Sequence, residues 1–286
     1  MQSFVGVLFD GFAYGMLLFL LSVGLSVTLG MMNFVNLAHC SFAMVGGYAT
    51  VTLMNKLGWP FFAALAAAFL VAAAVAVVLE RTLYRRLYGA SDLDQCLFTI
   101  GIVFISVAAF AWFYTTEQQS ARVPEYLRGA VQVMGMNFAA YRMFLVAVSL
   151  CIAGLLIFML EKTRFGATVR AAVDNQRMAR GLGIDVDRAF MITFALGGGL
   201  AGLGGGLAIE IVGLDPAFAL TYLVYVLIVV AVGGLGSIGG SFAAATVLGI
   251  SDMAGKYYFP WLGAFLIYLV MVALLMWRPA GLFGKR

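Results

Sequence analysis

The sequence has little charge, and this shortage decides the class of protein. Charged residues make up 10% of the 286 residues and hydrophobic residues 64%. A soluble domain has about a quarter charged and about half apolar residues. The mean hydropathy is +1.03. This balance excludes a water-soluble domain and indicates a chain that crosses a lipid bilayer several times.

Histidine and cysteine are also scarce. His39 alone excludes a histidine-rich metal site, and Cys40, Cys96 and Cys151 are too far apart for a CxxC pair. We expect no metal site and no disulfide, and we expect the cysteines to be buried reduced thiols. The net charge of +4 does not point to nucleic acid, because the basic residues are scattered through loops between apolar runs.

Charge-poor runs dominate the chain. They cover 12–32, 34–54, 61–79, 97–114, 143–160, 189–209, 219–232, 241–250 and 261–277. Since a spanning helix needs about 20 mostly apolar residues, we expect an all-α, polytopic transmembrane bundle of eight or nine segments, forming one domain over residues 1–286. The second run follows closely on the first, so it is either a full crossing or a broken, re-entrant element covered by protein or water.

Basic residues fall into two unequal groups of loops, and this asymmetry sets the orientation. One group holds twelve: Arg81, Arg85, Arg86, Lys162, Arg164, Arg170, Arg177, Arg180, Arg188, Arg278, Lys285 and Arg286. The other holds five: Lys56, Arg122, Arg128, Arg142 and Lys256. The positive-inside rule places the 161–188 loop and the C-terminus in the cytoplasm. The N-terminus lies outside with nine crossings, and inside if the second run is re-entrant. The first ten residues lack the basic region of a cleavable signal, so we expect the first run to be retained.

The 161–188 loop is too long for a simple connection between membrane helices. Residues 167–182 predict one helix with an apolar stripe of Val169, Val173 and Met178, which ends at the glycines that follow. Asp187 is placed to N-cap the next membrane helix. The loop helix either rests among lipid headgroups or docks into a groove on a cytoplasmic partner.

Glycine is abundant in one membrane run. Seven of the ten residues in 197–206 are glycine, and Gly198, Gly202 and Gly206 repeat at a spacing of four, as Gly236 and Gly240 do later. Glycines at this spacing leave one helix face without side chains, so helices can pack closely there. The alternative is that such faces let helices slide between inward-open and outward-open states. Neither glycine-rich run forms a Walker A loop, so we expect any ATP to be hydrolysed on another polypeptide.

Polar residues within the apolar runs are the candidate site. We predict a translocation path at Asn33, Asn36, His39, Thr99 and Ser237, with packing as an equal alternative for His39. Asp252 and Lys256 are spaced for a local ion pair of little value if it is wet, and we expect Glu210 and Asp215 at the water interface. The sequence has no supported catalytic constellation, so an enzyme is not expected.

Four blocks carry a family resemblance. Residues 165–207 read FGATVRAAVDNQRMARGLGIDVDRAFMITFALGGGLAGLGGGL, residues 33–39 NFVNLAH, residues 99–101 TIG and residues 233–239 GGLGSIG. In this order they resemble LivH-type permeases, the inner-membrane components of ABC importers for branched-chain amino acids. The family's coupling segment matches Gly166, Arg170, Ala171, Asn175, Ala179, Gly183 and Ile184. Two departures, Cys40 and the longer early block, fall near the presumed substrate route.

The resemblance implies a permease subunit that moves branched-chain or related amino acids by alternating access. It implies a second related permease, two cytoplasmic ATP-binding subunits, a periplasmic binding protein and a bacterial inner membrane. ATP and Mg²⁺ would bind the partner ATPases, and this chain would need no cofactor. We expect Arg170 and Asp174 to make polar contacts with an ATPase, and Val169 and Ala179 apolar ones. The alternative is a stand-alone secondary transporter or channel for a small polar solute; its signs, an inverted repeat and ionisable residues at mid-membrane, are not evident in the sequence.

Overall fold

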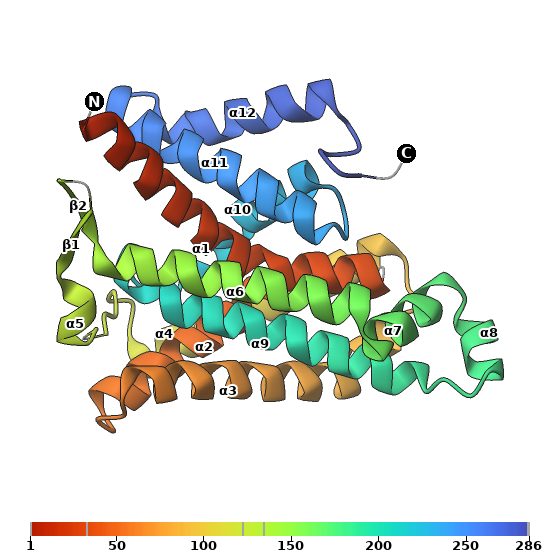
Figure 1. Ribbon diagram of the computed structural model, residues 1–286. Coiled ribbons are helices and arrows are strands. Elements are labelled where there is room, and N and C mark those ends of the chain that lie inside the picture. The colour runs from red at the N-terminus through yellow and green to blue at the C-terminus, as the bar shows by residue number, and fades with distance from the viewer. Residues whose placement is uncertain (1, 33, 122, 134, 285–286) are drawn as a thin grey trace.

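The computed structural model describes residues 2–32, 34–121, 123–133 and 135–284. Asn33, Arg122, Lys285 and Arg286, which enter the predictions above, lie outside these ranges. The chain is a bundle of helices with one small β-hairpin (Figure 1). The expected helical bundle is therefore confirmed, and the β-hairpin is an element that the sequence analysis did not predict.

Long apolar helices follow the charge-poor runs in order. They are α1 (Gln2–Met32), α2 (His39–Asn55), α3 (Phe61–Thr82), α4 (Asp92–Tyr114), α6 (Ala140–Lys162), α9 (Val186–Val212), α10 (Phe218–Gly233), α11 (Ile238–Tyr258) and α12 (Gly263–Trp277). Shorter elements connect them: η1 (Tyr84–Leu87), α5 (Glu125–Arg128), α7 (Arg164–Asp174), α8 (Gln176–Gly181) and the antiparallel strands β1 (Ala130–Val133) and β2 (Met136–Ala139).

Five of the described helices are long and apolar enough to cross a membrane: α1, α3, α4, α6 and α9. The pair α10 and α11 passes the same test together, with a bend of 120° between its two helices. At 17 residues, α2 is short for a crossing, and α12 is shorter still at 15. The described part of the chain thus holds five to six candidate spans, and the eight or nine segments remain a prediction.

The bundle has two chemically different ends. At one end, which we call the hairpin end, the β-hairpin lies near the start of α1, and α5 lies farther along the same end (Figure 1). Arg142 of α6 pairs there with Asp10 of α1. At the other, the arginine-rich end, lie α7 and α8 (Figure 1). Arg85 of η1 pairs there with Asp187 of α9. Because successive long helices run in alternating directions, the described members of the two basic groups lie at opposite ends.

Helix α9 forms the centre of the bundle, and its glycines set how closely its neighbours approach. A Cβ atom at Gly198 would lie 2.5 Å from the Cβ of Ala76, and one at Gly202 would lie 2.3 Å from the Cβ of Ala72. Gly206 faces Thr50 and Leu65. Along α3, the alanines at this contact are fully buried and repeat at a spacing of four: Ala64, Ala68, Ala72 and Ala76. Small residues on both helices therefore bring the backbones together, as membrane helix packing requires.

Other predicted packing glycines also lie at close approaches. A Cβ at Gly236 would lie 2.5 Å from Gly30 Cα in α1, and one at Gly240 would lie 1.9 Å from the Gly233 carbonyl oxygen. The turn between α10 and α11 is thereby pressed against the end of α1. Sliding of these smooth faces stays a prediction.

Candidate functional site

The irregular segment between α1 and α2 is held by two side chains of α4. The backbone N–H of Val35 donates to Gln95 Oε1 at 3.0 Å, and that of Leu37 donates to Thr99 Oγ1 at 3.1 Å. Irregular backbone at membrane depth persists only where protein or water satisfies its polar groups. Here Gln95 and Thr99, one helical turn apart, satisfy two N–H groups of this irregular segment. We call its described residues, 34–38, the break.

Gln95 is a residue that the sequence analysis missed. Its side chain is 3% exposed, and its Nε2 donates to the carbonyl oxygens of Leu87 and Ala90 at 3.2 and 3.3 Å. It therefore ties the connection before α4 to the break before α2. A usable signal existed, because Gln95 stands four residues before Thr99 and so shares its helix face.

The predicted path residues divide into one that lines a cavity and three that do not. A cavity of about 480 Å³ opens between α1, the break and α10, and its polar lining residues are Asn36 and Asp92. Asn36 is buried, and its Nδ2 has no partner in the described part of the chain. His39 instead packs within the bundle beside Gly24 and Phe42. Thr99 accepts the hydrogen bond from Leu37 N–H that helps to hold the break.

Ser237, the third path residue away from the cavity, caps a helix. Its side chain accepts a hydrogen bond from Gly240 N at 3.0 Å, at the start of α11. Serine is a favoured N-cap. The structure therefore gives Ser237 a local role at the arginine-rich end, and the path role assigned to it stays a prediction.

The loop helix predicted over 167–182 is two helices, so that prediction is wrong. The chain breaks at Asn175, whose backbone is extended (φ −156°, ψ 94°) and whose side chain accepts from Met178 N at 2.9 Å. Asparagine competes with helical backbone in this way and favours caps. Thr163 caps α7 in the same manner, and Gly183, with φ +82°, turns the chain after α8.

The expected apolar contacts with an ATPase need correction as well. Val169 and Ala179 are 0% and 2% exposed, because both face inward against the bundle. Met178 and Leu182 are 68% and 81% exposed. The exposed apolar side chains of the loop therefore lie on and just after α8.

Two other residues of the predicted coupling segment contact the end of α6. Arg170 donates to the carbonyl oxygen of Leu160, and Gly166 lies so near the same oxygen that a Cβ would be 2.0 Å away. Asp174 is exposed, while Ala171 and Ile184 are partly buried. Arg170 thus caps a helix of its own chain, a favourable place for a cation.

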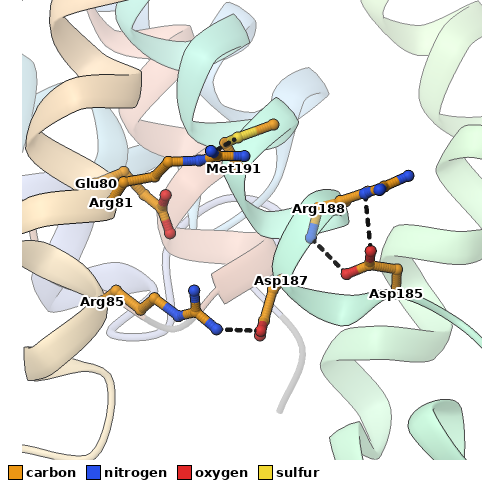
Figure 2. A pocket seen from close by; sticks show the side chains of 7 residues that line it. All are labelled: Glu80, Arg81, Arg85, Asp185, Asp187, Arg188 and Met191. Atoms are coloured by element: carbon orange, nitrogen blue, oxygen red, sulfur yellow. Dashed lines mark hydrogen bonds and ion pairs between the residues drawn. The ribbon is translucent and has the colours of Figure 1, made fainter.

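Charged residues line a second cavity, of about 410 Å³, at the arginine-rich end (Figure 2). Asp187 pairs with Arg85 and, at 2.9 Å, with Arg180, so η1, α8 and α9 are linked. Asp187 is not the N-cap that we predicted. Because α9 begins at Val186, Asp185 is the cap and accepts from Arg188 N at 3.0 Å.

A glutamate that lines this charged cavity is hydrogen-bonded to a tyrosine. The Tyr88 hydroxyl donates to Glu80 Oε1 at 2.6 Å. Burial, and then this hydrogen bond, raises the pKa of Tyr88 above its ordinary value, so the hydroxyl stays protonated and remains a donor. Glu80 is only 3% exposed. The bond therefore satisfies a carboxylate that would otherwise be buried at a cost.

The cysteines and acidic residues give no sign of metal chemistry in the described ranges. No three histidine, cysteine or acidic residues gather there as a metal site would need. All three cysteines are free thiols: Cys40 is buried, but Cys151 is exposed, against our expectation. Cys151 lies on the outward face of α6, only 28% of whose apolar window is buried.

A family model and curated relatives point to one family. A family model described as "Branched-chain amino acid transport system / permease component" matches residues 7–275. A probable LivH permease of Methanocaldococcus jannaschii is 27% identical, over 95% of this chain and 90% of its own length. LivH of Escherichia coli K12 is 25% identical, over 99% and 96%. Among solved structures, PsaBC from Streptococcus pneumoniae in complex with Fab aligns over 96% of this chain and 88% of its own, at 14% identity and a TM-score of 0.44.

Proposed function

The chain belongs to the family of branched-chain amino acid transport permease components, of the LivH type, and from that premise we propose that it is the permease subunit of an ATP-driven importer. It would form the translocation path for branched-chain or related amino acids and work by alternating access. The match over residues 7–275 carries this proposal. It does not favour the alternative of a stand-alone transporter or channel.

The arginine-rich end is where we place the ATPases. The α7–α8 segment projects there, and Met178 and Leu182 give it an exposed apolar surface beside exposed Asp174 and Arg177. A short helix with apolar anchors and a charged rim suits a groove on a partner. We propose two ATP-binding subunits that hold ATP and Mg²⁺, a second related permease, and a periplasmic binding protein at the hairpin end.

The cavity beside Asn36 is the proposed inner part of the path. It lies at the arginine-rich end, between α1 and α10, and its walls are apolar apart from Asn36 and Asp92. An unpartnered buried amide at a cavity wall can donate to a passing solute, whereas apolar walls suit an aliphatic side chain. Movement of the break held by Gln95 and Thr99 would change the width of this cavity.

We expect leucine uptake to require ATP. The complex would be reconstituted in proteoliposomes with its ATPases and binding protein, and radiolabelled leucine uptake measured with and without ATP inside. Uptake should fall to background without ATP, whatever ion gradient is imposed. Uptake that persists in ATP-depleted vesicles with a sodium or proton gradient would instead support the stand-alone transporter.

The orientation gives a separate expectation. In a background with serine at 40, 96 and 151, Met178→Cys should react with a membrane-impermeant maleimide only in inside-out vesicles, because the positive-inside rule puts α8 in the cytoplasm. Tyr126→Cys in α5, a residue 64% exposed, is the matched control and should react only in right-side-out vesicles. Labelling of both variants from one side would refute the proposed orientation.

A further inference from the structure

One carboxylate at the arginine-rich end is shared by arginines from two other elements. Asp187, in the first turn of α9, pairs through Oδ2 with Arg85 of η1 and through Oδ1 with Arg180 of α8, the latter at 2.9 Å. Figure 2 shows Arg85, on one side of the charged cavity, pointing toward Asp187 at the start of α9. Because each oxygen accepts from a different arginine, Asp187 links α8 to η1 as well as to α9.

Asp187 stands on a closely packed part of the bundle. Behind it, α9 packs on α3 at Gly198 and Gly202, where a Cβ atom would lie 2.5 or 2.3 Å from an alanine Cβ of α3. The Tyr84 ring of η1 packs on the Phe194 ring of α9, with centroids 5.2 Å apart. Close contact between backbones and between buried rings leaves little room for relative movement. Elements α3, η1 and α9 therefore form one body, and Asp187 lies at its edge.

Helix α8 is attached to that body through few contacts of the described residues. It lies between Asn175, which is extended, and Gly183, which has φ +82°, and such residues at the ends of an element can act as hinges. Its one buried residue is Ala179. Among the described residues, Arg180 is the one α8 side chain that hydrogen-bonds to another helix. The Arg180–Asp187 pair is therefore the polar tether between α8 and α9.

The other helix of the loop is fixed by its own contacts. Val169 and Ala172 of α7 are 0% exposed, and Arg170 donates to the Leu160 carbonyl oxygen at the end of α6. Since α7 is anchored without Asp187, the tether acts on α8.

From these contacts we infer that Asp187 is a positioning residue, which carries a displacement of α8 to η1 and α9. The side chains of Asp187, Arg85 and Arg180 are 44%, 56% and 59% exposed, and exposed ion pairs contribute little to folding stability unless several charges form a network. Loss of the Asp187 charge should therefore release α8 while the bundle stays folded. That the displacement of α8 is driven by a docked ATPase rests on the proposed function.

The tether can be measured on the purified full-length chain, without transport. Trypsin cuts after Arg177, an exposed residue of α8, and a helix must open locally before it is cut. Asp187→Asn and Arg180→Gln should each speed this cut about fivefold, and the double variant should be no faster, because both changes remove the same pair. Arg188→Gln is the matched control, since Arg188 pairs with Asp185 inside α9, and it should leave the rate within about 1.5-fold.

Uptake per ATP in the complete importer tests the positioning role. With Asp187→Asn, the ATPases should stay bound and hydrolyse ATP, but leucine imported per ATP should fall about fivefold or more. Asp187→Glu keeps the charge and should restore the ratio to within about twofold. Arg85→Gln removes the η1 arm alone, so it should lower uptake per ATP while the cut after Arg177 keeps its wild-type rate.

The outcomes separate this inference from the proposed function. Wild-type cleavage or wild-type uptake per ATP in Asp187→Asn, or no recovery in Asp187→Glu, would each overturn the inference and leave the proposed function in place. If the wild-type complex imports no leucine with ATP while the cut after Arg177 still depends on Asp187, the proposed function fails, and the tether stands as a feature of the fold without a part in transport.

Discussion

Replacing Met178 and Leu182 together with aspartate is expected to abolish ATP-driven uptake while the chain still inserts and folds. Both side chains are more than two-thirds exposed, and exposed substitutions usually change stability by about 0.5 kcal/mol or less. In a partner's groove, each apolar anchor contributes about 2 kcal/mol, or roughly 30-fold in affinity. Two buried carboxylates in that groove should therefore weaken ATPase binding by more than about 100-fold.

Co-isolation of the ATPases with the affinity-tagged permease measures this effect directly. The matched control is Leu57→Asp with Tyr126→Asp, two residues of similar exposure, 62% and 64%, at the hairpin end. The control should keep the ATPases bound. If the Met178 and Leu182 variant also retains them at wild-type levels, α8 is not the docking surface.

Arg170 shows why an attractive sequence position can be a poor test of docking. The resemblance marks it as part of the coupling segment, but its guanidinium already binds the Leu160 carbonyl oxygen. A charge reversal there would remove the cap of α6 and would confuse folding with docking. The sequence located the coupling segment. Which of its residues are exposed could not be read from it, because the helix is interrupted at Asn175 and α8 is turned relative to α7.

The order of the helices was readable from hydropathy, because each long helix follows one charge-poor run. Contacts across the bundle were not. The role of Gln95 depends on backbone groups of Val35, sixty residues away, and no local pattern states that pairing. The spacing of Asp252 and Lys256 predicted their ion pair but not the burial of Asp252, because helical spacing alone cannot tell which face α1 covers. The residues that sequence reasoning missed are thus those defined by long-range packing.

Replacing Gly205 with alanine is expected to destabilise the fold strongly, although it adds only one carbon atom. The new Cβ would lie 1.8 Å from the Ala43 carbonyl oxygen of α2. That atom is backbone within a helix, so it cannot rotate away, and α2 and α9 must separate. Overpacking of this kind costs about 1–3 kcal/mol, and the loss of close contact along the rest of the α2–α9 crossing adds to it.

Gly154→Ala in α6 is the matched control, because no atom of another described element lies within 4 Å of the Cβ position there. Alanine favours a helix over glycine by about 1 kcal/mol, so this change should be neutral or stabilising. Thermal unfolding of both variants in one detergent gives the comparison. We expect Gly205→Ala to melt roughly 5 °C or more below wild type, since about 1 kcal/mol shifts the midpoint of a chain of this size by about 2–4 °C. Equal melting of the two variants would mean that α2 and α9 do not cross at the glycines of α9.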